Sequence, residues 1–166
     1  MVRGRSIKAF PGPAHAVGFS LIEITVVVLV IAVLAAIVLP RFSQAQENTK
    51  VGAAASDLRQ IANAMQRYHA RHGDYPPDTF RGVFPPELAS DLVEFDLWNT
   101  PIGGAWDWDY WPNGVYAFKA CVTIVDGDPA LYQQLDELID DGELTTGQLQ
   151  RINQYGNRLQ FGIEHH

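Results

Sequence analysis

A continuous apolar stretch runs from residue 19 to residue 39, and Ser20, Glu23 and Thr25 are its only polar residues. A helix of these 21 residues, rising about 1.5 Å per residue, covers about 30 Å, the thickness of the hydrocarbon core of a bilayer. The pattern therefore predicts one membrane-spanning helix. A secretory signal peptide is the competing interpretation, but its apolar region is only about 7–15 residues long and ends in small residues, whereas this stretch ends at Pro40.

Beyond Pro40 the pattern becomes amphipathic, with apolar residues recurring at steps of three and four. This periodicity predicts a helix with one buried face. Its apolar positions are Val51, Ala55, Leu58, Ala62, Met65 and Tyr68 or His69. Gly73 is a suitable C-terminal stop, and the Pro76-Pro77 pair forbids continuation of the helix.

We therefore expect one helix from Phe19 to His72, with Pro40 inside it. Proline removes a hydrogen bond to the carbonyl four residues earlier and crowds that turn, so the helix should kink there. The alternative is that Pro40 marks a simple boundary between a membrane anchor and a separate domain.

A loop and a β-hairpin are predicted next. Residues 73–104 are rich in proline and glycine and predict a loop with one helical turn. The period then becomes two, because Trp106, Trp108 and Tyr110 alternate with Asp107 and Asp109. Pro112-Asn113-Gly114 separates this run from a long strand candidate at residues 115–125, and Asn-Gly in such a position is a strong hairpin signal.

The C-terminal part predicts one helix and one strand. The helix should run from Pro129 to about Asp140, with Asp128 as its N-cap and Gly142 as its stop. Residues 158–163 have the pattern of a final strand. The expected fold class is α+β, with a long kinked N-terminal helix, membrane-spanning in its first half, packed on a small antiparallel sheet.

Length, cysteine content and charge limit the classes of protein to which this chain can belong. The chain has 166 residues, which fits one compact domain plus attachments. Its only cysteine, Cys121, excludes an internal disulfide and a multi-thiolate zinc site. The formal charge of -7 argues against nucleic-acid binding. Arg3, Arg5 and Lys8 precede the apolar stretch without any acidic residue, which indicates a cytoplasmic amino end.

Acidic residues are the first candidates for a site. Asp107 and Asp109 share one strand face, and Asp126 and Asp128 flank a glycine. Carboxylate oxygens suit calcium, but no stretch matches an ordered calcium loop. We therefore expect solvated acidic turns and strand edges, and no residue is predicted as a metal ligand.

The histidines, the cysteine and the tryptophans give weaker indications of a functional site. His69 and His72 lie one turn apart without a third ligand, so a solvated helix end is expected. Cys121 lies in a strand without an identifiable base, which favours a buried small apolar residue over a nucleophile. The tryptophans within residues 98–111 form either part of the core or a sugar- or peptide-binding platform, and their alternation favours the core.

Glu23 is the exception within the apolar stretch, because a carboxylate at the centre of a membrane helix costs about 2.5–3.5 kcal/mol. Either it lies near the end of the segment and reaches headgroup water, or it has a function. The string Gly18-Phe19-Ser20-Leu21-Ile22-Glu23 closely resembles the processing site of type IV pilins and type II secretion pseudopilins. In that family a basic leader ends in Gly, and Phe, a small hydroxyl residue, Leu-Ile, Glu and an apolar helix follow.

The resemblance at the level of motifs covers residues 1 to about 76. Pro40 lies where many family members carry a helix-kinking proline, and the helix end from Tyr68 to Tyr75-Pro76 is also similar to theirs. The resemblance implies cleavage after Gly18 by prepilin peptidase, followed by N-methylation of Phe19. It divides the chain into a leader (1–18), a transmembrane and assembly helix (19–39), an amphipathic second half of that helix (40–72) and a globular C-terminal domain (73–166).

The resemblance also implies a role for Glu23 and for bound calcium. The family's Glu pairs with the methylated amino terminus of a neighbouring subunit and so fixes the axial register. Its major secretion pseudopilins carry a structural calcium in the general region of the acidic residues above, and no other cofactor is expected. Without the leader, 9 Lys+Arg face 19 Asp+Glu over residues 19–166, which makes the mature chain decidedly acidic.

The expected function is that of a structural subunit, not an enzyme. A type II secretion pseudopilin is favoured because the chain lacks the paired cysteines of many pilins. The implied partners are identical and related subunits, prepilin peptidase and an inner-membrane assembly platform, with the C-terminal domain in the periplasm of a bacterium. A type IV pilus (minor) pilin is one alternative, and a membrane-anchored binding module that uses the aromatic hairpin is another.

Overall fold

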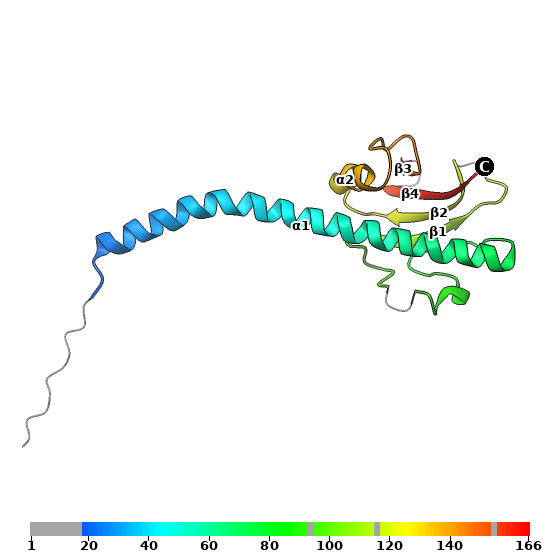
Figure 1. Cartoon of the computed structure of the whole chain (residues 1–166), viewed down its shortest axis with the longest axis horizontal. Helices are drawn as coiled ribbons and strands as arrows, with labels where there is room; N and C mark the ends of the chain where they lie inside the picture. The colour runs from blue at the N-terminus through cyan, green and yellow to red at the C-terminus, as the bar shows by residue number, and fades with distance from the viewer. Residues whose placement is uncertain (1–17, 93–94, 115–116, 154–155) are drawn as a thin grey trace, which may run out of the picture. The chain divides into compact units, whose positions relative to one another are not determined.

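The computed structural model describes residues 18–92, 95–114, 117–153 and 156–166. Their elements are α1 (Leu21–His72), the 3-10 turn η1 (Pro86–Leu88), β1 (Ala105–Tyr110), β2 (Phe118–Val125), α2 (Pro129–Ile139), β3 (Leu149–Ile152) and β4 (Arg158–His165), as Figure 1 shows. The predicted leader up to residue 17, the residues 93–94 and the residues 115–116 of the strand candidate lie outside the described residues. The chain divides into two units, 1–41 and 42–166, which are described separately below.

The described part of the first unit is the apolar beginning of α1. The side chains from Leu21 to Leu39 are almost all exposed, and by length and composition α1 is a helix that can cross a membrane. The helix begins at Leu21, two residues later than predicted, because Ser20 caps it. The carbonyl of Ser20 accepts hydrogen bonds from the backbone N–H groups of Glu23 (3.1 Å) and Ile24 (3.2 Å). Pro40 lies inside the assigned helix, as predicted.

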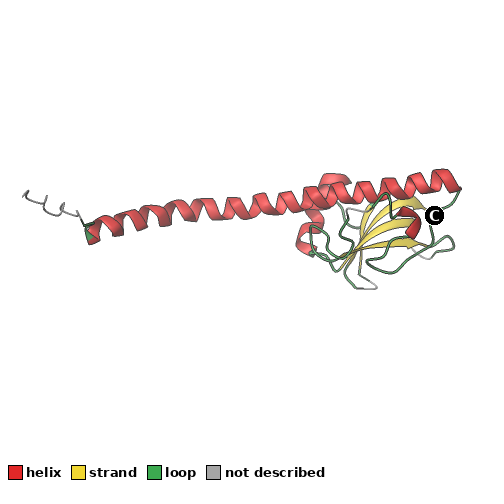
Figure 2. Cartoon of the chain, turned by 90° about the horizontal axis from the view of Figure 1, so that it is seen from below, coloured by secondary structure: helices red, strands yellow, loops and turns green. Residues whose placement is uncertain are grey.

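The second unit is a helix-on-sheet domain. Its four strands are all antiparallel and lie in the order β1-β2-β4-β3. The second half of α1 lies along one face of this sheet (Figure 2). Its buried positions follow the predicted periodicity and join the sheet and α2 in one hydrophobic core. They are Val51, Ala54, Ala55, Leu58, Ile61, Ala62, Ala64 and Met65. The predicted α+β fold class, a long apolar helix and a small antiparallel sheet, is confirmed.

The end of α1 and the start of α2 are set by the residues that the sequence predicted. Gly73 terminates α1 with φ +81, and its N–H donates to the carbonyl of His69 at 2.8 Å, as expected of a glycine stop. The Asp128 carboxylate caps α2 by accepting from the N–H of Ala130 at 3.0 Å. Gly142 is not the stop of α2, because the chain already leaves the helical conformation at Asp140.

The predicted hairpin of two antiparallel strands is present. Trp108 of β1 lies opposite Val122 of β2, and β2 begins at Phe118. The final strand, β4, is also present and extends to His165. The sequence pattern did not predict β3, a strand of 4 residues that pairs only with β4.

Candidate functional site

The residues of the expected processing site lie just before the first helix. Gly18 to Ser20 are not helical, and Phe19 is 77% exposed. The backbone at these residues is therefore exposed and outside the helix. Glu23 lies in the first turn of α1, where the partial positive charge of the helix N-terminus favours a carboxylate.

The aromatic hairpin contributes to the core rather than to an open platform. Trp106 and Trp108 are 1% and 0% exposed, and the indole N–H of Trp108 donates to the carbonyl of Pro76 at 3.0 Å. Tyr110 is half-buried, and its hydroxyl donates to Asp74. This hydrogen bond raises the pKa of Tyr110 to about 12. The prediction of core packing for these strand residues is confirmed.

The other face of the hairpin holds a buried charge cluster, and the expectation of solvated carboxylates there is wrong. Asp107 and Asp109 are 6% and 4% exposed. The guanidinium of Arg158 lies 2.7 Å from Asp107 Oδ2 and 3.1 Å from Asp109 Oδ1. The hydroxyl of Thr123 also donates to Asp109. Burial and the charge of Asp109 outweigh Arg158 and raise the pKa of Asp107 to about 6.

This burial was missed because alternation with tryptophan suggested one buried and one wet face of the sheet. Arg158, in the predicted final strand, was the residue that could have indicated this buried cluster. A buried arginine needs carboxylates as partners, and Asp107 and Asp109 are carboxylates of the same predicted sheet. The two remaining acidic candidates have separate structural roles. Asp126 pairs with Arg81 at 2.6 Å, and Asp128 is the N-cap of α2.

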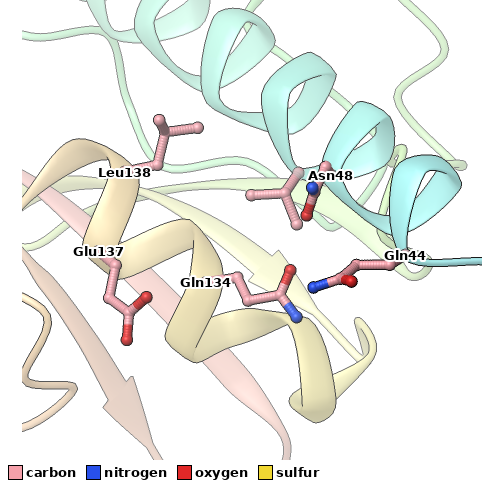
Figure 3. Close-up of a pocket in the computed structure, with 6 residues that line it drawn as sticks. Gln44, Asn48, Gln134, Glu137 and Leu138 are labelled. Atoms are coloured by element: carbon pink, nitrogen blue, oxygen red, sulfur yellow. The ribbon is translucent and has the colours of Figure 1, made fainter. Parts of the chain in front are cut away.

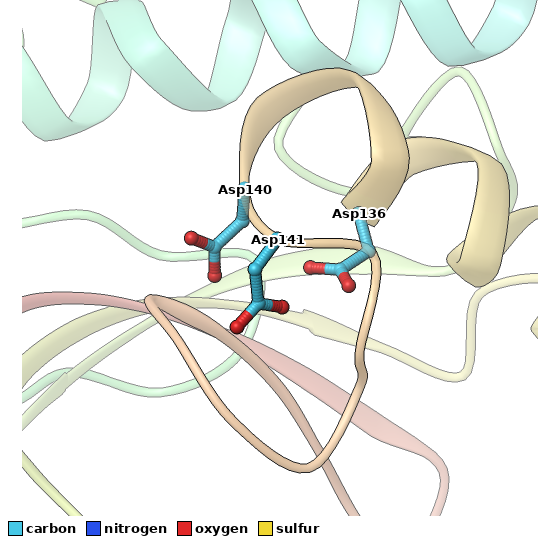
Figure 4. Close-up of side chains that lie close together, drawn as sticks. All are labelled: Asp136, Asp140 and Asp141. Carbon is cyan, nitrogen blue, oxygen red and sulfur yellow. The ribbon is translucent and has the colours of Figure 1, made fainter.

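A different group of carboxylates comes together after α2. Asp136, Asp140 and Asp141 place one carboxylate oxygen each within 4.8 Å of one another, and Figure 4 shows them gathered at the turn that follows the helix. Asp136 is fully buried, and within the described part of the chain neither of its carboxylate oxygens has a hydrogen-bond partner. Burial, together with the negative charge of Asp140 and Asp141, raises the pKa of Asp136 to about 6.

The turn fixes the two other carboxylates of the group. Asp140 Oδ2 accepts from the backbone N–H of Leu149 at 2.8 Å, and Asp141 Oδ1 accepts from the N–H of Glu143 at 2.9 Å. Three convergent carboxylates, one of them buried without a partner, fit the oxygen ligands that calcium prefers. If calcium binds, these residues would hold it and it would supply the missing positive charge. The sequence signal was the spacing of Asp136 and Asp140, one helical turn apart.

His69, His72 and Cys121 have separate structural surroundings. The rings of His69 and Tyr75 stack at 4.4 Å, and those of His72 and Tyr68 at 4.2 Å. Cys121 is fully buried, as predicted, and burial raises the pKa of its thiol well above the usual value.

One hollow of the globular unit lies between α1 and α2 and has a volume of about 510 Å³. Its polar lining comes from Gln44 and Asn48 of α1 and from Gln134 and Glu137 of α2 (Figure 3). Three of these four side chains are amides, which bind by hydrogen bonds and do not transfer protons at neutral pH. The hollow therefore has the chemistry of a contact surface.

Known proteins that are similar to this chain indicate which family it resembles. No protein-family model matches the chain. Over 59 residues the chain is 41% identical to the type II secretion system core protein G of Pseudomonas aeruginosa. The resemblance to pilins and pseudopilins is confirmed. The match covers 36% of this chain and 42% of the relative, so the chain matches less than half of the length of that protein.

A solved structure is also similar to this pilin-like chain. The major type IV pilin PilA1 from Clostridium difficile aligns with 74% of this chain and 98% of its own, with a TM-score of 0.47 and 16% sequence identity. The likeness is too distant to support an argument about function. The pilin-like features that bear on function are therefore those of the chain itself: the processing motif, the exposed apolar helix and the globular unit.

Proposed function

We propose that this chain is a structural subunit of a pilin-like filament, with a type II secretion pseudopilus as the favoured assembly. It would act by polymerisation, not by catalysis. The observation that carries the proposal is the string from Gly18 to Glu23, which leads into an exposed apolar helix and forms its first turn. The similarity to core protein G supports the choice of a secretion pseudopilus.

The first step of the proposed function is processing. Prepilin peptidase would cut after Gly18, and the new amino terminus at Phe19 would be methylated. The non-helical, exposed backbone from Gly18 to Ser20 supports this step, because a peptide bond in the body of a helix would first have to be unwound. Gly18 also has no neighbouring atom within 4 Å of where a side chain would begin, so the local structure leaves room for an enzyme.

The second step is assembly through α1. From Leu21 to Leu39 almost every large apolar side chain is about half exposed or more, so this surface needs a bilayer or other helices to cover it. In hydrocarbon the carboxylate of Glu23 and the amine of Phe19 of a neighbour would each be costly alone, and pairing them would offset that cost. Pro40 would let the apolar half of the helix adjust its direction relative to the globular unit.

The proposed location follows from the same features. The helix would anchor the chain in the bacterial inner membrane with the amino end in the cytoplasm and the globular unit in the periplasm. Identical and related subunits, prepilin peptidase and the assembly platform would be its partners. The rival binding-module function is weakened, because Trp106 and Trp108 are buried and unavailable to a ligand.

The amino terminus of the protein in native membranes tests the processing step. We expect intact mass and N-terminal peptide analysis to give a mature chain that begins at methylated Phe19. An unprocessed Met1, or a cut beyond Leu39, would be incompatible with a pilin-like subunit.

Glu23→Gln tests assembly, because it keeps size and removes the charge. We expect the variant to accumulate as mature protein in the membrane and to give no crosslinked ladders of subunits. Glu47→Gln is the matched control, since it removes a carboxylate from the same helix outside the apolar stretch and should assemble normally. Normal ladders of pure Glu23→Gln protein would count against charge pairing.

A further inference from the structure

Two exposed aromatic side chains lie in the segment of the globular unit between α1 and β1. Phe80 is 89% exposed and Trp98 is 59% exposed, whereas Trp106 and Trp108 are fully buried. Large exposed aromatic residues mark interaction surfaces, and tryptophan is among the residues that contribute most to binding. We call Phe80 and Trp98 the aromatic knob. It belongs to neither the processing motif nor the buried hairpin.

Backbone hydrogen bonds to the outer edge of β1 hold the aromatic knob in place. The N–H of Gly82 donates to the carbonyl of Trp106 at 2.9 Å, and the N–H of Trp106 donates to the carbonyl of Leu97 at 3.0 Å. These bonds fix the two loops that carry the knob next to each other. A side chain at Gly82 would begin only 2.4 Å from Cε2 of Trp98, so the indole lies directly against the glycine backbone. A group fixed in this way loses little entropy on binding.

The knob carries a negative charge beside it. The Asp96 carboxylate accepts hydrogen bonds from the N–H of Trp98 at 3.1 Å and from the side chain of Asn99 at 2.8 Å. The hydrogen bond from Asn99 is the main reason why the pKa of Asp96 is lowered. Asp96 is therefore ionised and has no basic partner among the described residues.

The opposite flank of the same unit has a complementary hollow. It has a volume of about 210 Å³ and lies between α1 and the β3–β4 side of the sheet. Half-buried Phe161 and Ile163 give it apolar walls, and Arg59 and Gln66 of α1 form its rim. Arg59 is exposed and takes part in none of the ion pairs of the described chain.

The two surfaces carry opposite charges. The hollow also has polar lining from Asn63 and Gln148, and its volume of about 210 Å³ exceeds the volume of about 150 Å³ that accommodates a benzene molecule, so an aromatic ring can enter it beside Phe161 and Ile163. A guanidinium such as that of Arg59 is attracted to the face of an indole, and Asp96 supplies the opposite charge beside it. We propose that Trp98 of one copy of this chain seats in the hollow of the next copy, with Asp96 facing Arg59. This proposal rests on the proposed function, in which copies polymerise.

The position of the two surfaces explains why this contact would repeat. The knob lies outside β1 and the hollow lies beside β3, and these strands are the opposite edges of the sheet (Figure 1). A contact between two different surfaces is heterologous, so each bound copy leaves one knob and one hollow free for further copies. The globular units would then form a lateral contact of their own, in addition to the contacts of the apolar helix.

The first test uses the full chain in its native membranes. We expect Trp98→Ala to lower the yield of sheared filaments by about tenfold or more, because truncation of a central aromatic contact commonly costs that much affinity. Arg71→Ala is the control, since Arg71 is exposed in the last turn of α1 and lies in neither surface. Processed, protease-resistant monomer should stay at the wild-type level in both variants.

Charge reversal tests the pair directly. Arg59→Glu and Asp96→Arg should each reduce filament yield, and the double variant should recover most of it. Recovery requires the two residues to face each other, so it separates a direct contact from a general loss of charge. No recovery, with both single variants defective, would overturn the pairing.

Cysteine crosslinking gives an independent measurement. The chain's own Cys121 is fully buried, so introduced thiols are the accessible ones. A chain carrying both Trp98→Cys and Gln66→Cys should give disulfide-linked ladders, and a chain with either substitution alone should not. If wild-type filaments form while Trp98→Ala and Arg59→Glu also assemble normally, the lateral contact is wrong and the proposed function stands. If the processed wild-type chain forms no filaments, the proposed function itself fails.

Discussion

The buried cluster of Asp107, Asp109 and Arg158 makes a quantitative prediction about pH. The cluster holds two carboxylates and one guanidinium, and the nearby carboxylate of Asp78 also acts on Asp107, so negative charge is in excess when all these groups are ionised. The structure places this excess on Asp107, whose pKa is raised from 3.8 to about 6. Asp107→Asn removes the excess charge, and Asp107 Oδ1, which has no partner among the described residues, is replaced by an atom of similar size.

The expected magnitude follows from linkage. A carboxyl whose pKa is higher in the folded than in the unfolded chain costs nothing well below the unfolded pKa, where both forms are protonated. The cost grows as the pH rises from the unfolded pKa to the folded pKa and is constant above it, at about 3 kcal/mol for a shift of about two pKa units. Asp107→Asn should therefore exceed the wild type in stability by only about 0.5 kcal/mol near pH 4 and by up to about 3 kcal/mol at pH 7.

Urea unfolding of the full chain in detergent, followed by tryptophan fluorescence between pH 4 and 8, measures this difference. Arg158→Gln is the opposite control, because it leaves two buried carboxylates without their cation and should cost about 3–5 kcal/mol at pH 7. The assignment of the excess charge to Asp107 would be refuted if the Asp107→Asn variant were less stable than the wild type at pH 7. The same holds if the difference in stability did not change with pH.

Three further predictions concern other parts of the chain. Trp108→Ala should cost about 3–5 kcal/mol, comparable with the whole stability of a small domain, and Trp108→Phe should cost less; thermal unfolding by circular dichroism distinguishes them. Calcium should raise the midpoint of thermal unfolding of the wild type, EDTA should reverse this, and Asp136→Asn should abolish the response. Pro40→Ala should protect its new amide from hydrogen exchange by bonding to Ala36, with unchanged unfolding of the globular unit; an unprotected amide there would mean that the helix is broken at this point.

Local signals predicted much of the fold because each acts over a few residues. The Asn113-Gly114 pair correctly indicated the hairpin, Gly73 the end of α1, and Asp128 with Pro129 the start of α2. The strand β3 was missed because its four residues, from Leu149 to Ile152, are too few to show a period. Its formation depends on β4, which comes later in the chain.

The candidate sites were harder to predict because they depend on segments that are distant in sequence. Arg158 approaches Asp107 and Asp109 only when β4 joins the sheet beside β2. The knob at Trp98 and the hollow at Arg59 are defined by which side chains the core leaves exposed, and hydrophobicity alone does not separate Trp98 from Trp106. Glu23 is the exception, since its role was inferred from a local motif, and that role remains a prediction.

The hydrogen bonds at the outer edge of β1 also protect the protein from misassembly. An exposed strand edge is a template for pairing with another chain and leads to aggregation. Here both backbone groups of Trp106 that face outward are already bonded to loops, and at the other edge the N–H of Arg151 in β3 donates to the carbonyl of Leu144 at 2.8 Å. In the proposed function, copies concentrated in a membrane for polymerisation would bring many identical sheets close together. Loops bonded at Trp106 and Arg151 would hinder those sheets from joining strand to strand and would favour growth through surfaces made of side chains.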